Sequence, residues 1–80
     1  MENMITLSRL RAVLQHEIQR RTPQSIELRR PGEVLVLPPD AEAVINELLV
    51  RGVDEVELIK CDVTYIVERD FLYALTVEVK

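Results

Sequence analysis

Hydrophobic residues recur every three or four positions near the N-terminus of the chain. The positions that share this spacing are Leu7, Leu10, Leu14 and Ile18. Because this is the period of one face of an α-helix, a helix is predicted over residues 6–21. Thr6 is suited to cap its first turn, since its hydroxyl can accept a hydrogen bond from a free backbone N–H. The Thr22-Pro23 pair ends the helix, because the residue before a proline is forced out of the α region.

A second helix, with clearer boundaries, is predicted after residue 40. Asp40 is a strong N-cap and places a negative charge at the helix N-terminus. The hydrophobic stripe that follows comprises Ala41, Val44, Ile45, Leu48 and Leu49. Gly52 lies just beyond the last turn, where a glycine commonly ends a helix, and Val53 can supply the hydrophobic contact that accompanies this motif.

The remaining segments predict β-strands. Residues 25–29 alternate between hydrophobic and polar side chains, as in a strand with one solvent-exposed face, and residues 33–37 form a second strand. Pro31-Gly32 between them favours a type II turn. The twist of this turn fits a tight hairpin poorly, so a loop longer than two residues is expected. Three more strands are expected over residues 55–60, 63–68 and 71–80, with Cys61-Asp62 as a turn or a bulge.

These elements predict one α+β domain over residues 1–80, with the order αββαβββ. A two-layer structure is expected, in which two helices form one layer and pack on a mainly antiparallel sheet of about five strands. A chain of 80 residues has a small core and modest stability. Cys61 is the only cysteine and His16 the only histidine, which excludes a disulfide within the chain and a Cys/His zinc site. Self-association is therefore expected to add stability.

Charge is divided unevenly along the chain. The composition, 48% hydrophobic and 30% charged, is that of a soluble globular protein with a net charge of −4. Residues 1–31 carry a net +3 and residues 32–80 a net −7, which predicts a polarised surface. A lone thiol is typical of the reducing cytoplasm. The N-terminus lacks a secretion-signal pattern and no hydrophobic run is long enough to span a membrane, so a cytoplasmic location is expected.

Basic residues of the N-terminal third form one candidate surface for binding an anion or a partner. Arg9, His16 and Arg20 lie in a narrow arc beside the hydrophobic face of the first helix. The full candidate set is Arg9, His16, Arg20, Arg21, Arg29 and Arg30. Such a surface can bind phosphate groups or an acidic protein, although a solvent-exposed helix face is the simpler interpretation. Nucleic acid is disfavoured, because the acidic remainder repels it and no glycine-rich or aromatic-flanked basic motif is present.

No set of residues has the spacing of a catalytic or metal site, so no catalytic residue, metal or cofactor is predicted and the chain is not expected to be an enzyme. The acidic cluster comprises Asp54, Glu55, Glu57 and Asp62. Its simplest interpretation is the polar face of a strand, and a surface for a basic protein is the alternative. Cys61 stands beside Asp62, whose charge raises the pKa of a thiol. Nothing in the spacing brings Cys61 to His16.

Aromatic residues lie on the last two predicted strands. If the hairpin turns at Arg69-Asp70, Tyr65 lies opposite Tyr73 and Val67 lies opposite Phe71. A sheet face with aromatic residues can stack nucleic-acid bases. Cross-strand packing under the helices is the favoured interpretation, because the neighbours on this face are hydrophobic.

Hydrophobic surface exceeds what two helices can cover. Residues 34–37 are hydrophobic at every position, so both faces of that strand favour burial. The candidate oligomer interface comprises Leu35, Leu37, Val50, Ile66, Leu72 and Ala74. The sequence thus predicts a small non-catalytic protein-interaction or regulatory protein that acts as a homo-oligomer. Two alternatives stay open, a nucleic-acid-associated protein that uses the basic helix and first strand, and an acidic inhibitor of a basic partner protein.

Overall fold

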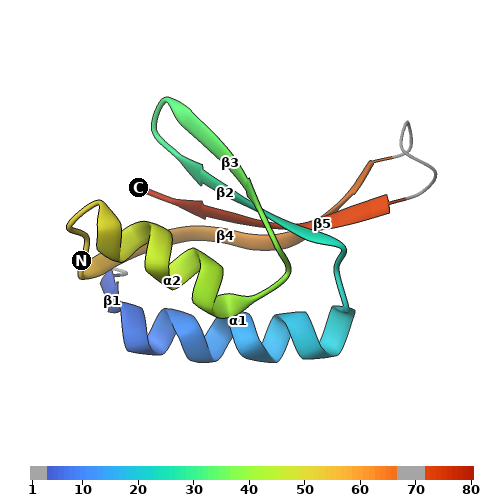
Figure 1. Cartoon of the computed structure of the whole chain (residues 1–80), viewed down its shortest axis with the longest axis horizontal. Coiled ribbons are helices and arrows are strands. Elements are labelled where there is room, and N and C mark those ends of the chain that lie inside the picture. Colours follow the sequence, from blue (N-terminus) through green and yellow to red (C-terminus); the bar gives the residue numbers. More distant parts are fainter. Residues whose placement is uncertain (1–3, 67–71) are drawn as a thin grey trace.

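A five-stranded sheet and two helices form the two layers of this protein, shown in a computed structural model that describes residues 4–66 and 72–80 (Figure 1). In chain order the elements are β1 (Met4–Thr6), α1 (Leu7–Arg21), β2 (Ser25–Arg30), β3 (Glu33–Leu37), α2 (Ala41–Val50), β4 (Glu55–Ile66) and β5 (Leu72–Val79). The strands are ordered β1-β4-β5-β2-β3. Only the β2–β5 pairing is parallel among these strands. The predicted α+β class, with two helices on a mainly antiparallel sheet, is confirmed.

The fifth strand of the sheet comes from the N-terminus, where no strand was predicted. Met4–Thr6 pairs antiparallel with the start of β4, and the amide of Leu7 donates to the carbonyl of Asp54 over 3.3 Å. The two strands expected over residues 55–60 and 63–68 are instead one strand as far as Ile66. Cys61 is therefore neither a turn nor a bulge, since it pairs with Val77 on β5. The expected pairing of Val67 with Phe71, and the turn at Arg69-Asp70, lie outside the described residues.

Helix α1 begins and ends at the residues that the sequence indicated. The Thr6 hydroxyl accepts a hydrogen bond from the backbone N–H of Arg9 over 3.2 Å. At the other end, Thr22 adopts a left-handed φ of 46° and donates its N–H to the carbonyl of Ile18 over 2.8 Å. The Tyr73 hydroxyl of β5 hydrogen-bonds to the carbonyl oxygens of Arg21 and Thr22. This contact ties the helix C-terminus to the sheet.

Helix α2 has the predicted caps at both ends. An Asp40 carboxylate oxygen accepts from the N–H of Glu42 over 3.0 Å. Beyond the last turn, Gly52 has a φ of 76°, and its N–H donates to the carbonyl of Leu49 over 2.9 Å. The N–H of Val53 donates to the carbonyl of Leu48 over 2.9 Å. These two bonds form a Schellman motif, which satisfies carbonyl groups that the helix leaves free.

The hairpin between β2 and β3 is tighter than expected. Arg30 pairs with Glu33, so Pro31 and Gly32 alone form the loop, and the expectation of a longer one was wrong. Gly32 has a φ of 78°, the conformation that a type II turn requires at its third residue. Five cross-strand pairs, with Leu28 buried and Leu35 packed against the core, hold the strands together despite the poor match in twist.

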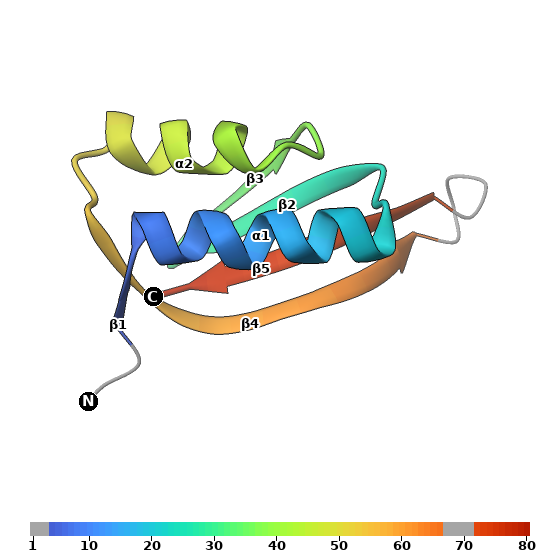
Figure 2. The same cartoon turned by 90° about the horizontal axis from the view of Figure 1, so that it is seen from below.

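The core lies between the sheet and the helices. Figure 2 shows both helices on the same face of the sheet, with α2 on the side of β3 and α1 on the side of β4. The largest fully buried side chains are Leu10, Leu14, Ile26, Leu28, Ile45, Leu48, Leu75, Val44, Val77 and Val79. They come from both helices, β2 and β5, so each helix buries most of its predicted stripe. Leu49 is the exception, since it was predicted on the core stripe of α2 but is 54% exposed. The other face of the sheet is uncovered by either helix.

Candidate functional site at the edge of β3

Strand β3 forms one end of the sheet. It pairs with β2 on one side, and no strand of the described residues pairs with its other side. Antiparallel pairs alternate between hydrogen-bonded and non-hydrogen-bonded sites, and a two-residue loop makes Arg30 and Glu33 a hydrogen-bonded pair. The N–H and C=O groups of Val34 and Val36 therefore point away from β2, toward the open edge. An open edge of this kind is a template for another strand.

Val34 and Val36 also carry the exposed hydrophobic surface of this strand. Their side chains are 54% and 66% exposed, on the sheet face opposite the helices. Leu35 and Leu37 point to the helix side, where they are half-buried and pack against the core. The predicted interface residues Leu35 and Leu37 thus lie mostly inside the protein, and the alternation of the strand exposes the two valines between them. Val34 and Val36 were missing from the predicted set.

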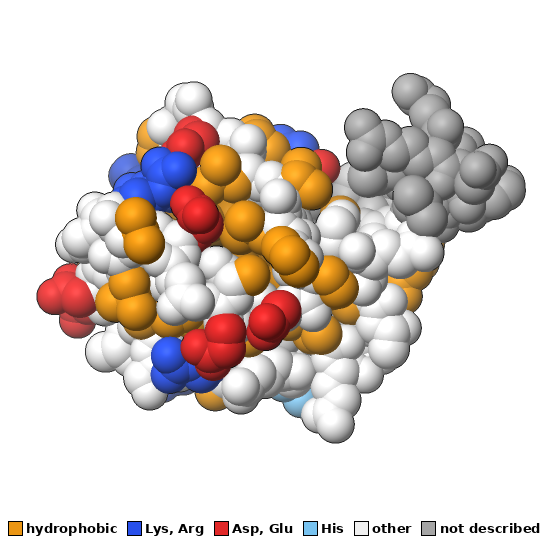
Figure 3. Space-filling model, in the orientation of Figure 1, with side chains coloured by type: hydrophobic (Ala, Val, Ile, Leu, Met, Phe, Trp, Pro, Cys, Tyr) orange, Lys and Arg blue, Asp and Glu red, His pale blue; other side chains and the backbone are white. Residues whose placement is uncertain are grey.

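Helix α2 borders the same open edge from the helix side of the sheet (Figure 2). Arg51 places Nη1 2.8 Å from a carboxylate oxygen of Glu33 and Nε 3.4 Å from one of Glu47, which joins the end of the helix to the start of the strand. Val50 is 84% exposed, as expected for a predicted interface residue opposite the core stripe. Figure 3 shows hydrophobic side chains along β3 and over α2, with charged groups among them. We name this surface the β3 edge face, comprising residues 33–37, Glu47, Val50 and Arg51.

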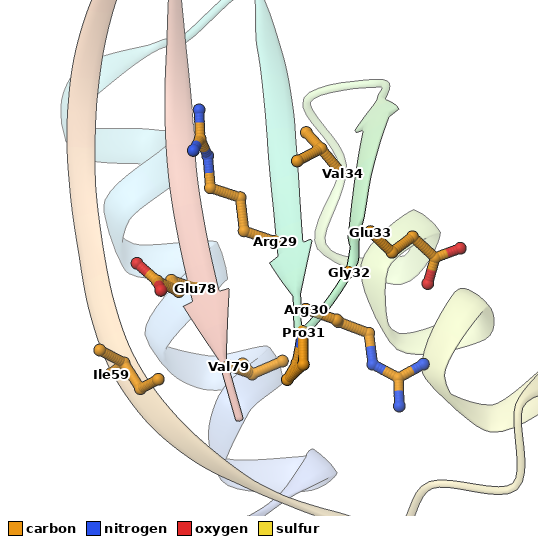
Figure 4. Close-up of a pocket in the computed structure, with 9 residues that line it drawn as sticks. All are labelled: Arg29, Arg30, Pro31, Gly32, Glu33, Val34, Ile59, Glu78 and Val79. Atoms are coloured by element: carbon orange, nitrogen blue, oxygen red, sulfur yellow. The ribbon is translucent and has the colours of Figure 1, made fainter.

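A hollow of about 430 Å³ lies next to the β3 edge face, at the hairpin end of the uncovered sheet face. Across it, Figure 4 shows Ile59 of β4, Glu78 of β5, Arg29 of β2 and Val34 of β3, in the order of the strands. Arg29 lies 3.1 Å from a carboxylate oxygen of Glu27. Because both signs of charge line the hollow, it has no preference for an anion.

The basic residues predicted as a binding surface are not brought together. Arg9, His16 and Arg20 are exposed on α1, but Arg20 and Arg21 both lie near Glu17, at 3.7 Å and 2.8 Å. Arg29 and Arg30 lie at the far end of β2, roughly 17 Å of strand away from the C-terminus of α1. The side chains of Arg29 and Arg30 also point to opposite faces of the sheet, because Arg30 extends toward α2 and Arg29 extends away from it (Figure 4).

Ion pairs also join the two oppositely charged parts of the sequence. Arg11 of α1 places Nε 2.7 Å from a carboxylate oxygen of Glu42 of α2, a contact between the N-terminal basic part and the acidic part. Arg51 and Glu33 pair within the acidic part. The charges of the two parts are thus partly neutralised inside one domain.

The remaining predicted interface residues have different positions. Ala74 has no exposed surface, because it lies on the central strand β5 between Ser25 of β2 and Thr64 of β4, so it was wrongly placed at an interface. The backbones of Ile66 and Leu72 pair at the end of β4 and β5. Their side chains lie outside what the structure describes.

The aromatic pairing expected from the sequence is confirmed where it is described. Tyr65 pairs with Tyr73, and their ring centroids are 5.7 Å apart. Tyr73 is half-buried against the end of α1, whereas Tyr65 is 70% exposed. This pair thus joins the last hairpin to the helix layer at one end of the sheet.

Cys61 lies on the helix side of β4, half-buried and near α1. Burial raises the pKa of its thiol to about 11, and the charges of Glu17 and Asp62 act in the same direction against Arg21. The predicted effect of Asp62 is present, but burial is the larger cause. A thiol with this pKa is protonated and weakly nucleophilic near neutral pH.

The acidic residues do not converge on a metal site. Within residues 4–66 and 72–80, no three His, Cys, Asp or Glu side chains are grouped so as to hold a metal ion. Glu55 and Glu57 instead pair with Thr6 and Met4 of β1. The acidic residues therefore lie along β4 as a polar strand surface, which was the simpler interpretation of the sequence.

Comparisons with models of protein families, with curated proteins and with solved structures found no match to this chain. Neither helix of the described residues combines the length and the hydrophobicity needed to cross a membrane. The functional interpretation therefore rests on the geometry of the β3 edge face.

Proposed function

We propose that this chain is a small, non-catalytic interaction or regulatory protein that associates with itself through the β3 edge face. The observation that carries this proposal is the pair Val34 and Val36, each more than half exposed on an end strand with an open edge. Pairing of a second strand there satisfies the open backbone groups and brings the valines of the two copies into cross-strand contact. We place the protein in the cytoplasm, in keeping with its free thiol.

The opposite side of the sheet supports the choice of β3. Strand β1 pairs only with the first three residues of β4, so the rest of β4 has an open edge. In this part, the register of β4 against β5 shifts between Leu58 and Lys60, which leaves Ile59 without a partner on β5. Such a bulge, together with the charged residues Lys60 and Asp62, discourages pairing with another chain. Residues 34–37 of β3 carry no charge and β3 has no bulge against β2.

The two alternatives drawn from the sequence have less support. For nucleic acid, the basic residues are divided between the two ends of α1, with Arg9 at the start and Arg20 and Arg21 at the end, and the β2–β3 hairpin. Glu17 also lies close to both Arg20 and Arg21. For an acidic inhibitor, the acidic residues lie along β4, where the exposed hydrophobic residues described beside them are Met4 of β1 and Ile59. Tyr65 is 70% exposed but lies on the helix side of β4, so the acidic face presents no exposed aromatic anchor among the described residues. Interfaces of useful affinity depend on such anchors.

Light scattering coupled to size-exclusion chromatography tests self-association directly. We expect the wild-type chain to shift from monomer to dimer between about 10 μM and 1 mM. Val36→Lys replaces a valine of the proposed contact with a charged residue of the kind that open strand edges use to prevent pairing, and should weaken association at least tenfold, about 1.4 kcal/mol. Since Val36 is exposed in the monomer, the variant should keep the wild-type circular dichroism spectrum and melting temperature.

Ile59→Lys is the matched control. Ile59 is 53% exposed, close to the exposure of Val34, but it stands on β4, away from the β3 edge face. We expect this variant to associate as the wild type does. A wild-type chain that stays monomeric through the whole range, or equal loss of association in both variants, refutes the proposal.

A further inference from the structure

We infer that two copies pair antiparallel along β3 in a single register, with Val34 opposite Val36 of the second copy and Leu35 on the two-fold axis. This inference rests on the proposed self-association and adds its geometry. Hydrogen-bonded pairing across the new edge has to join residues whose backbone groups point outward, and these are Val34 and Val36. Three symmetric registers satisfy this rule, with Val34 opposite Val34, Val34 opposite Val36, or Val36 opposite Val36.

Charge adds a small preference for the middle register. Within one copy, Val34 is paired with Arg29 and Val36 with Glu27. When Val34 faces Val36 of the second copy, each cross-strand row has Arg29 at one end and Glu27 at the other. When Val34 faces itself, both ends of its row are Arg29, and when Val36 faces itself, both ends are Glu27. The two ends of a row are three strand spacings apart, about 14 Å, so this arrangement of charges adds only a weak, salt-screened preference for the first case.

The residues that flank the strand, Gly32 in the turn and Pro38, select the middle register. When Val34 pairs with Val34 of the second copy, Val36 lies opposite Gly32 in the turn of the second copy and has no strand residue as a partner. Pairing Val36 with itself sets Val34 opposite Pro38, which has no N–H to donate. Only the middle register overlaps all five residues of both strands.

This pairing also closes the assembly. A two-fold contact uses the same edge of both copies, so no β3 edge is left to recruit a third chain. The result is one continuous sheet in which both copies keep their helices on the same face, and Leu35 meets Leu35 of the second copy beside α2. The outer ends of that sheet are the short β1 strands and, beyond them, the open part of β4, whose bulge and charged residues discourage further growth.

Disulfide trapping tests the register in a Cys61→Ser background, which removes the native thiol. Mild oxidation should cross-link Leu35→Cys to itself, because Cα atoms of a directly opposed pair are about 4.5 Å apart, within disulfide reach. A mixture of Val34→Cys and Val36→Cys chains, with one chain tagged, should give the mixed dimer by intact mass. Either valine variant alone should give at least tenfold less, as should Ile59→Cys.

Amide hydrogen exchange provides a test on the unmodified chain. The amides of Val34 and Val36 should exchange about tenfold more slowly once nine-tenths of the chain is dimeric, because only the monomer exposes them. The amide of Leu35, which faces β2, should not depend on concentration. A dimer that cross-links through Val34→Cys alone or Val36→Cys alone, or without concentration-dependent protection, overturns the register but leaves self-association standing. A monomer at all concentrations overturns both.

Discussion

Ionisation of Cys61 should destabilise the fold at high pH. Its thiol is held between β4 and α1 with a pKa of about 11, against 9.0 for the unperturbed group. Below pH 9 the thiol is protonated in both states and the stability it confers is fully present. Between pH 9 and 11 the unfolded chain ionises while the folded chain does not, so stability falls as pH rises. A difference of two pKa units sets the limit at roughly 2–3 kcal/mol.

Comparison with Cys61→Ala isolates this contribution. Urea unfolding of both chains at about pH 8 and pH 10.5 gives the difference in unfolding free energy at each pH. The smaller alanine lowers stability by an amount that does not depend on pH, and the titrations of tyrosine and lysine cancel in the difference. We expect the advantage of the wild type to shrink by about 2 kcal/mol over this range.

Thiol reactivity provides an independent measurement. At about pH 8, a pKa of 11 leaves near 0.1% of the thiol ionised, against near 9% at a pKa of 9.0. Alkylation of the folded chain should therefore be about 90-fold slower than alkylation of the urea-unfolded chain. A free-energy difference that stays constant from about pH 8 to 10.5, together with equal alkylation rates, refutes the assignment of Cys61 as a buried structural thiol.

Two further substitutions test contacts that hold the helices in place. Asp40→Ala removes the N-cap of α2 and should lower the unfolding free energy by about 1 kcal/mol in urea titrations, whereas Asp40→Asn, which keeps an acceptor oxygen, should lose less than half of that. Tyr73→Phe removes the hydroxyl that is hydrogen-bonded to the C-terminal carbonyls of α1 and should lower the unfolding free energy by about 0.5–1.5 kcal/mol. The control is Tyr65→Phe, because this ring is 70% exposed, and it should change the unfolding free energy by less than about 0.5 kcal/mol.

Features with local causes were predictable from the sequence. The boundaries of both helices depend on residues within one turn of each end, such as Thr6, Asp40 and Gly52, whose hydrogen bonds and φ angles follow from their own chemistry. Strand β1 was missed because three residues are too few to show a period of two. The prediction of two strands in place of β4 was wrong, because Cys61-Asp62 interrupts the hydrophobic pattern of the sequence while both residues stay paired with β5.

Strand order depends on contacts between distant segments, which local patterns do not encode. The parallel pairing of β2 with β5 places the last strand of the chain between two earlier ones. This arrangement buries Ala74 at the centre of the sheet and sends β3 to its end. The side-chain direction of residues 34–37 is likewise fixed only by the register, which pairs Leu28 with Leu35 in the core.

The unbroken hydrophobic run of β3 conflicts with its place at the end of the sheet. Strands that are hydrophobic at every position are typical of the sheet interior, where both faces and both edges are covered. Open strand edges usually carry charge or a bulge, as β4 does near Ile59, beyond the residues that pair with the short end strand β1. In one copy, Val34 and Val36 are left exposed. In the proposed dimer the two β3 strands become the central pair of a ten-stranded sheet, so both edges of each β3 are paired and the valines of the two copies contact each other across the new edge, which the isolated chain does not provide.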